Sequence, residues 1–160
     1  MKSLSNKLKE FVINTGNPID SINFKGCMGF FLGDSKEFVL SRIEHLELMN
    51  EEEKESLDND FFLYGSYSRT DIIRTSCGLF NNIKKISFFF NGDLLNSIHI
   101  DIFPQQTDIS NLIDIIKQKI INNVGKPEVE VKNAASWIGK NSIININQVN
   151  NEYYVAVGRY

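Results

Sequence analysis

The sequence has few of the residues that build metal and redox sites. It contains only two cysteines, Cys27 and Cys77, and two histidines, His45 and His99. Neither cysteine belongs to a CxxC pair and neither histidine to an HxxxH or HExxH frame, the spacings that zinc sites use. We therefore expect no metal and no cofactor. Because a cytoplasmic chain keeps its cysteines reduced, we expect both to be buried structural thiols.

Long apolar runs are also missing. No segment approaches the roughly 18 apolar residues of a membrane-spanning helix, and the first residues contain no apolar core of a secretory leader. We therefore expect a cytoplasmic protein that does not engage a membrane. The net charge of −3 and the lack of an RRM-like signature argue against nucleic acid as a partner.

Motifs for phosphate binding and nucleophilic catalysis are incomplete. Residues 139–142 are similar to the end of a P-loop, but Ala134 stands where the first glycine of that motif belongs. Gly65-Ser66 is not part of a GxSxG elbow. These segments are most simply turns, and we expect no enzyme activity from them.

The composition is that of one folded domain. The chain has 160 residues, 42% hydrophobic and 23% charged, so residues 1–160 suffice for a single ordinary core. Within residues 1–16 the apolar side chains follow helical spacing up to Gly16. We expect an N-terminal helix there that packs on the body of the domain.

The second half of the chain carries the clearest fold signal. Residues 83–90 and 94–103 alternate like strands around Asn91-Gly92, a strong hairpin turn. Helical spacing then begins after Asp108 or Ser110 and stops at residues 125–127. Strands are expected at 129–131, 143–149 and 153–159. Ile98, Ile100 and Ile102 share the strand face that should meet the core.

The same rules of turn chemistry and hydrophobic periodicity apply to the first half of the chain. Asp34 is the expected cap of a short helix with Glu37 as its capping-box partner, and strands are expected at 61–68 and 71–77. The apolar stripe of that helix, predicted to be buried, is Val39, Leu40, Ile43 and Leu46. The predicted architecture is α+β: a two-layer sandwich with an antiparallel sheet of about five to seven strands and two or three helices packed on one face.

One strand carries a serine, a histidine and an aspartate on a single face: Ser97, His99 and Asp101. Alternate residues on a strand stand about 6.5–7 Å apart and point in parallel, so they do not converge as a catalytic triad must. We interpret this face as solvent-exposed and as a candidate surface for a partner.

An acidic segment is the strongest compositional anomaly. Residues 44–60 hold eight acidic side chains against one lysine, a net charge of −7. The eight are Glu44, Glu47, Glu51, Glu52, Glu53, Glu55, Asp58 and Asp60. The segment is either a solvated face or a docking surface for a basic partner. Complementary charge would accelerate the association of such a partner.

Two stretches, residues 30–46 and 90–102, carry a family resemblance. The first contains Gly33-Asp34-Ser35 before the short helix, and the second contains the Asn91-Gly92 hairpin. The chain resembles small bacterial α+β domains of the β-lactamase-inhibitor-like and outer-membrane-assembly-lipoprotein type. Trp137 and the final hairpin suit that pattern, while the lipoprotein leader is missing. The resemblance implies a non-enzymatic protein-binding scaffold.

The leading hypothesis is therefore a non-enzymatic protein of the immunity or inhibitor type. It would bind a toxin or an enzyme through its sheet face and its acidic segment. One alternative is a small enzyme or ligand-binding domain that uses His99 and Asp101 in a pocket between sheet and helices. Another is a structural subunit of a larger assembly, which predicts an exposed edge strand near residues 153–160.

Overall fold

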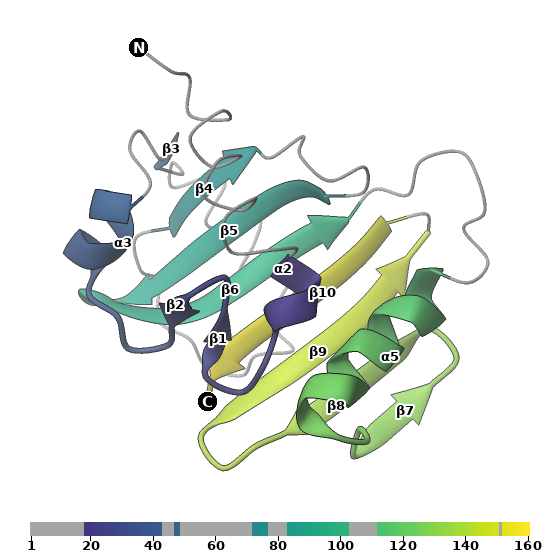
Figure 1. The fold of residues 1–160 in the computed structure, drawn as a ribbon. Helices are drawn as coiled ribbons and strands as arrows, with labels where there is room; N and C mark the ends of the chain where they lie inside the picture. The colour runs from purple at the N-terminus through teal and green to yellow at the C-terminus, as the bar shows by residue number, and fades with distance from the viewer. Residues whose placement is uncertain (1–17, 43–46, 49–71, 77–82, 103–111, 151) are drawn as a thin grey trace.

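The computed structural model describes residues 18–42, 47–48, 72–76, 83–102, 112–150 and 152–160. Its main feature is one antiparallel sheet with helices on one side (Figure 1). The sheet consists, in chain order, of β3 (Glu47–Leu48), β4 (Ile72–Ser76), β5 (Ile83–Asn91), β6 (Leu94–Ile102), β7 (Val129–Val131), β8 (Ala134–Ile138), β9 (Ser142–Val149) and β10 (Glu152–Arg159). The remaining described elements are the ribbon of β1 (Gly26–Cys27) with β2 (Phe30–Phe31) and the helices α2 (Pro18–Ser21), α3 (Lys36–Arg42) and α5 (Leu112–Val124).

The predicted α+β class with an antiparallel sheet is confirmed. The sheet has eight strands in the described part of the chain, slightly more than expected, because the short strands β3 and β8 were not predicted. The predicted helix within residues 1–16 and the strand at 61–68 lie outside the described residues. None of the helices described here is long and apolar enough to cross a membrane.

The strand order places the last strand in the middle of the sheet. The order is β3-β4-β5-β6-β10-β9-β8-β7, so β10 has β6 on one side and β9 on the other. Val155 lies opposite Ile100 of β6 and Ile146 of β9. The exposed edge expected near residues 153–160 is therefore wrong. Tight β-branched pairs on both sides favour a central position over an edge.

Two glycines account for the turn between β5 and β6 and for the end of α5. Gly92 has φ +63° and lets the chain reverse between β5 and β6. Gly125 has φ +96° directly after α5, and its N–H donates a 2.8 Å hydrogen bond to the Ile121 carbonyl oxygen. This left-handed residue ends the helix where the sequence predicted its stop.

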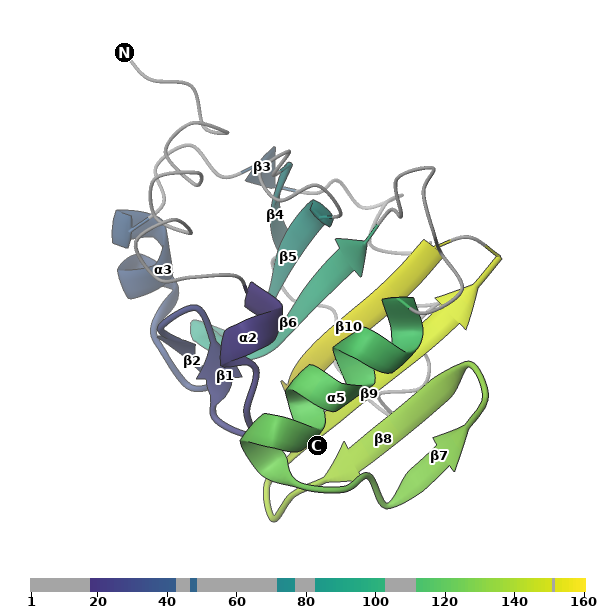
Figure 2. The same cartoon turned by 45° about the vertical axis from the view of Figure 1, so that its right-hand side comes forward.

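The core lies between the sheet and its covering elements. Helices α2 and α5 and the β1–β2 ribbon lie over one face, the front face (Figure 2). Ile98, Ile100 and Ile102 are buried there, as predicted. Helix α5 contributes Ile113, Ile116 and Ile120 to the same cluster. The burial of these branched side chains supplies most of the stabilisation between the two layers.

The β1–β2 ribbon carries one of the two cysteines into this core. Cys27 is buried and free, and burial raises the pKa of its thiol to about 12. The predicted buried thiol is therefore confirmed for Cys27, whereas Cys77 lies outside the described residues. A thiol held neutral in an apolar environment is a poor nucleophile and metal ligand.

Candidate functional site

The serine, histidine and aspartate of β6 lie on the back face, which is the face of the sheet opposite α2 and α5. They are Ser97, His99 and Asp101, and they share this face as the alternation predicts. Phe89 of β5 lies opposite Ser97, and Ser87 lies opposite His99. Strand pairing thus surrounds the three side chains with neighbours from both flanking strands.

The interpretation of this face as solvent-exposed is wrong for two of the three residues. Ser97 is only 5% exposed and His99 only 4%, while Asp101 is half-buried. The ring of Phe89, itself buried, lies 4.3 Å from the His99 ring, centroid to centroid. Alternation identifies which residues share a face, but it does not say whether that face is covered. Ser97 and His99 are therefore not part of an open binding surface.

On β10, the residues opposite His99 and Ser97 have no polar side chain. Ala156 lies opposite His99, and Gly158 lies opposite Ser97. A methyl group built at Gly158 would lie 2.8 Å from the Ser97 Cβ atom, so the two strands are closely packed here. Neither neighbour supplies an acid, a base or an oxyanion donor from its side chain. Asp101 has Tyr154 opposite it in the register.

The acidic segment is described at one point only. Glu47 belongs to β3, the strand at one edge of the sheet, and pairs with Arg74 of β4 in the register. The other seven members lie outside the described residues: Glu44, Glu51, Glu52, Glu53, Glu55, Asp58 and Asp60. The segment therefore includes the strand that ends the sheet on this side.

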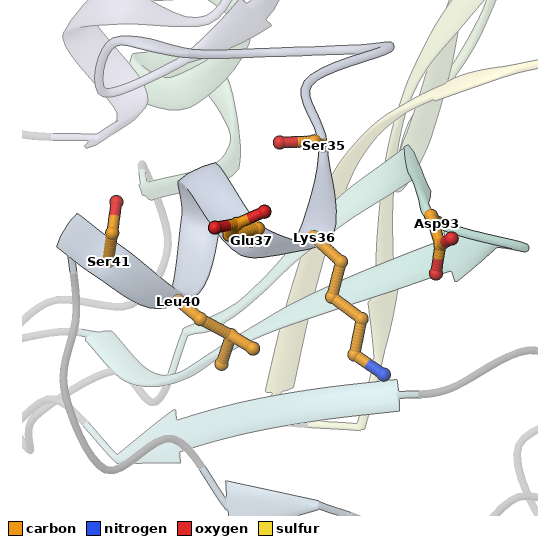
Figure 3. Close-up of a pocket in the computed structure, with 6 residues that line it drawn as sticks. All are labelled: Ser35, Lys36, Glu37, Leu40, Ser41 and Asp93. Carbon is orange, nitrogen blue, oxygen red and sulfur yellow. The ribbon is translucent and has the colours of Figure 1, made fainter.

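A groove of about 680 Å³ opens beside α3 and is the candidate binding site (Figure 3). Its lining residues are Ser35, Lys36, Glu37, Leu40, Ser41 and Asp93. Five of them belong to α3 or its cap, and Asp93 comes from the turn between β5 and β6. The lining does not include His99 or Asp101, so this groove is not the pocket that the enzyme alternative needs.

The cap of α3 differs by one residue from the sequence prediction. The Ser35 hydroxyl oxygen accepts a 3.1 Å hydrogen bond from the Phe38 N–H, three residues on, which is N-cap geometry. The Asp34 carboxylate instead accepts a 2.8 Å hydrogen bond from the Phe31 N–H, which closes the turn after β2. Asp34 therefore shapes the approach to the helix, and Ser35 begins it.

Backbone hydrogen bonds fasten this approach to the β5–β6 hairpin. The Gly33 N–H donates to the Leu95 carbonyl oxygen at 2.8 Å, and the Leu95 N–H donates to the Asp34 carbonyl oxygen at 2.8 Å. The Lys36 N–H donates to the Asp93 carbonyl oxygen at 2.7 Å. Because main-chain groups on both sides make these bonds, one wall of the groove is held firmly against the other.

Exposed apolar side chains lie on the two elements that form the groove, α3 and the β5–β6 hairpin. Leu40, which lines it, is 38% exposed, and Phe38 and Leu94 are also exposed. The predicted burial of Leu40 is therefore wrong, whereas Val39 is fully buried as expected. Three consecutive apolar residues on a helix cannot all face the core, since each successive residue turns by about 100°. The run at residues 38–40 was the sequence signal for this surface.

The chemistry of the groove is that of a contact surface. The lining contains one lysine, Lys36, and two carboxylates, Glu37 and Asp93, among hydroxyl and apolar groups. Within the described residues no three histidine, cysteine, aspartate or glutamate side chains are grouped closely enough to hold a metal ion. We call Phe38, Leu40 and Leu94 with the groove lining the α3 surface. It combines exposed apolar side chains with charged and polar ones, a composition found at protein interfaces.

Comparison of the chain with protein-family models, with curated proteins and with solved structures finds no match. The assignment of function therefore rests on the geometry and charge of this molecule alone.

Proposed function

We propose that the protein is a non-enzymatic binding protein that engages a partner protein through the α3 surface and the neighbouring acidic segment. The observation that carries the proposal is the exposure of Leu40, which lines an open groove, together with that of Phe38 and Leu94 on the two elements that form the groove. Grouped apolar side chains on a surface are a common mark of protein–protein contact. The polar and charged lining beside them can supply the rim of such an interface.

The rigidity of the α3 surface supports the same function. The chain between Gly33 and Lys36 is bound to the β5–β6 hairpin by three main-chain hydrogen bonds. At the other end of α3, the Arg42 guanidinium lies 5.5 Å from the Phe30 ring centroid and 5.4 Å from that of Phe38. A surface ordered before binding loses less conformational entropy when a partner arrives, and its affinity is correspondingly higher.

Charge points to the chemistry of the partner. The acidic segment begins two residues after α3, and only four residues separate Arg42 from Glu47 of β3. A linker of this length spans at most about 18 Å, so the edge strand with its acidic residue lies near the α3 surface. Figure 1 shows α3 towards the β3 edge of the sheet. The net charge of −7 over residues 44–60 would attract a basic partner surface and accelerate association.

The specific form that we propose is an immunity or inhibitor protein of the cytoplasm. Such a protein occupies a toxin or an enzyme, and occlusion needs a firm surface and complementary charge but no catalytic group. The partner is proposed to be a protein with a basic surface, not a nucleic acid or a membrane. Apolar anchors in the centre and acidic residues at the side would give this contact both affinity and selectivity.

Affinity capture with the full chain tests the proposal. The bait is used against extract from the native host and against the co-expressed products of neighbouring genes, beside a Leu40→Glu variant and an Ile115→Glu control. Ile115 is an exposed apolar residue of α5, so the control adds the same charge away from the α3 surface. We expect the wild type and the control to retain one basic partner and Leu40→Glu to lose it.

Two further measurements make the result decisive. Raising the salt concentration should slow association, because the attraction between exposed charges is screened. A partner that is an active toxin or enzyme should lose activity in proportion to the bound wild type. The proposal fails if Leu40→Glu captures the partner as well as the control does. It also fails if no partner is found and the purified chain turns over a small molecule.

A further inference from the structure

Strand β7 forms the second edge of the sheet and carries exposed apolar residues. It pairs with β8 only and ends the strand order opposite β3. Val129 is 54% exposed and Val131 is 59% exposed, and the register places both on the back face. Ile138 of β8 is exposed on the same face. Figure 2 shows the outer side of β7 turned away from the other described strands.

The sequence along this edge is complementary to its own reverse. Around Glu130 the order is Glu128, Val129, Glu130, Val131, Lys132. When two copies of such a strand pair antiparallel about the central residue, each residue meets the one at the same distance on the other side. Valine then lies opposite valine twice, and glutamate lies opposite lysine twice. Opposite charges directly across a strand pair stabilise it, whereas like charges destabilise it.

We propose that two copies of this chain associate through their β7 strands, antiparallel and centred on Glu130. The association has twofold symmetry, so the same patch serves both copies. Val129 of one copy lies beside Val131 of the other on the back face. With Ile138 from each copy, these side chains form one apolar strip. In a single copy the same side chains are exposed to solvent. The main-chain groups along the outer side of β7 gain partners in the same step.

The central glutamates have a counter-charge within each copy. Glu130 points to the front face, where its carboxylate lies 3.4 Å from the Lys117 ammonium group. Lys117 is nearly buried and also donates a 2.8 Å hydrogen bond to the Val131 carbonyl oxygen. The two glutamates therefore meet as members of two ion pairs, which offsets their repulsion.

The flanking charges, Glu128 and Lys132, lie just outside the three residues of β7. One oxygen of the Glu128 carboxylate accepts a 2.7 Å hydrogen bond from the Ile138 N–H of β8. Lys132 lies at the other end, in the turn to β8. The strand has three residues, and a contact of this length belongs to the small, transient class of interfaces. The dimer is therefore a weak one that forms as the protein concentration rises.

Sedimentation or light scattering over a concentration series tests the association. We expect the mass to rise from that of one chain, 18.3 kDa, towards twice that value. Lys132→Glu should shift this rise to higher concentration, because it opposes glutamate to glutamate twice. Lys140→Glu makes the same change of charge in the β8–β9 turn and should leave the series unchanged. Val129→Asp should weaken the dimer, whereas Val149→Asp, on the interior strand β9, should not.

Cross-linking tests the register. Residues opposite each other in an antiparallel pair have Cα atoms about 4.5–5.5 Å apart, a separation that a disulfide can span. Under mild oxidation Glu130→Cys should form a covalent dimer much faster than Asn122→Cys, an exposed position on α5, and faster than the wild type. A constant monomer mass, or equal cross-linking of both variants, overturns the proposal. Strand addition by a different protein would also leave the purified chain monomeric and so contradict it. None of these variants touches the α3 surface, so partner capture is expected to survive.

Discussion

Trp137 and Gly125 are joined by a 2.9 Å hydrogen bond from the indole Nε1–H to the carbonyl oxygen. Trp137 lies on β8 and is fully buried, whereas Gly125 is the residue that ends α5. One side chain therefore fills the space between the two layers and satisfies a carbonyl group that the helix end leaves without an intrahelical partner. The same contact sets the position of the helix end on the sheet.

Replacing Trp137 tests this contact. Trp137→Phe removes the donor and shrinks the ring, and we expect it to lower the free energy of unfolding by about 1–3 kcal/mol. Trp137→Ala should lower it by about 3–5 kcal/mol because a large cavity follows. Ile138→Ala, at the exposed neighbouring position, serves as the control and should change it by less than about 0.5 kcal/mol. Urea unfolding followed by circular dichroism measures all three, and equal midpoints for Trp137→Phe and the control would contradict the role of the bond.

Gly33 is required where the chain turns into α3. Its φ is +97°, and a methyl group there would lie 2.4 Å from the Arg159 guanidinium Nη2. Arg159 would have to move and give up its 3.0 Å hydrogen bond to the Leu32 carbonyl oxygen. We expect Gly33→Ala to cost the usual 1–2 kcal/mol or so of a left-handed alanine, plus the cost of this displacement.

A second glycine separates the two costs of that substitution. Gly92 also has positive φ, +63°, but has no atom within 4 Å of an added methyl group. Gly92→Ala should therefore show the backbone cost alone and destabilise the protein less than Gly33→Ala does. In an Arg159→Ala background the difference between the two substitutions should shrink. Thermal unfolding of the four variants measures it, and an unchanged difference would rule out Arg159 as its source.

Val39 and Leu40 are adjacent on α3 and should behave differently. Val39 is fully buried, and Val39→Ala should lower the free energy of unfolding by about 1–3 kcal/mol through lost packing. Leu40 is exposed at the groove, and Leu40→Ala should change it by less than about 0.5 kcal/mol. Chemical denaturation distinguishes the two. Comparable losses at both positions would mean that Leu40 belongs to the core and is not free to contact a partner.

Burial of Cys27 makes stability depend on pH in the alkaline range. The pKa of its thiol is raised from 9.0 to about 12 in the folded protein, so between these values the folded state holds a proton that the unfolded state has lost. The stability that this group contributes is full below pH 9 and is lost as the pH rises towards 12. Cys27→Ala should flatten the alkaline part of the stability curve, measured as the difference between the two proteins. Thiol reagents should modify Cys27 only as fast as the protein unfolds, and rapid modification of the native state would contradict its burial.

Much of the second half of the fold can be predicted from local patterns. The hairpin around Gly92, helix α5 with its stop at Gly125, and strands β7, β9 and β10 follow from turn chemistry and hydrophobic periodicity. Strand β8 was missed, although it carries Trp137, because residues 134–138 are short and only weakly alternating. The strand order could not be predicted from the sequence either. Which strands pair depends on contacts far apart in sequence, and local periodicity contains no information on them.

The site was harder to predict than the fold. The alternation of β6 correctly placed Ser97 and His99 on one face, but their burial depends on packing with Phe89, a residue of another strand. The exposure of Leu40 is likewise set by where α3 sits on the hairpin, through the hydrogen bonds of Gly33 and Lys36. Polar or apolar character alone gave the wrong exposure in both cases. The exposure of a side chain depends on how the layers pack, whereas the local sequence indicates only which residues share a face.

The central position of β10 has a consequence for the synthesis of the protein on the ribosome. Residues 152–159 are the last of the strands to be synthesised, yet β6 and β9 both pair with them. Until they emerge, the nascent chain holds two separate half-sheets, each with a long open flank. A product truncated before β10 would leave both of these strand edges unpaired. Unpaired strand edges promote aggregation and degradation. Strand β10 therefore joins the two half-sheets, because only a chain translated through residue 159 can close this sheet.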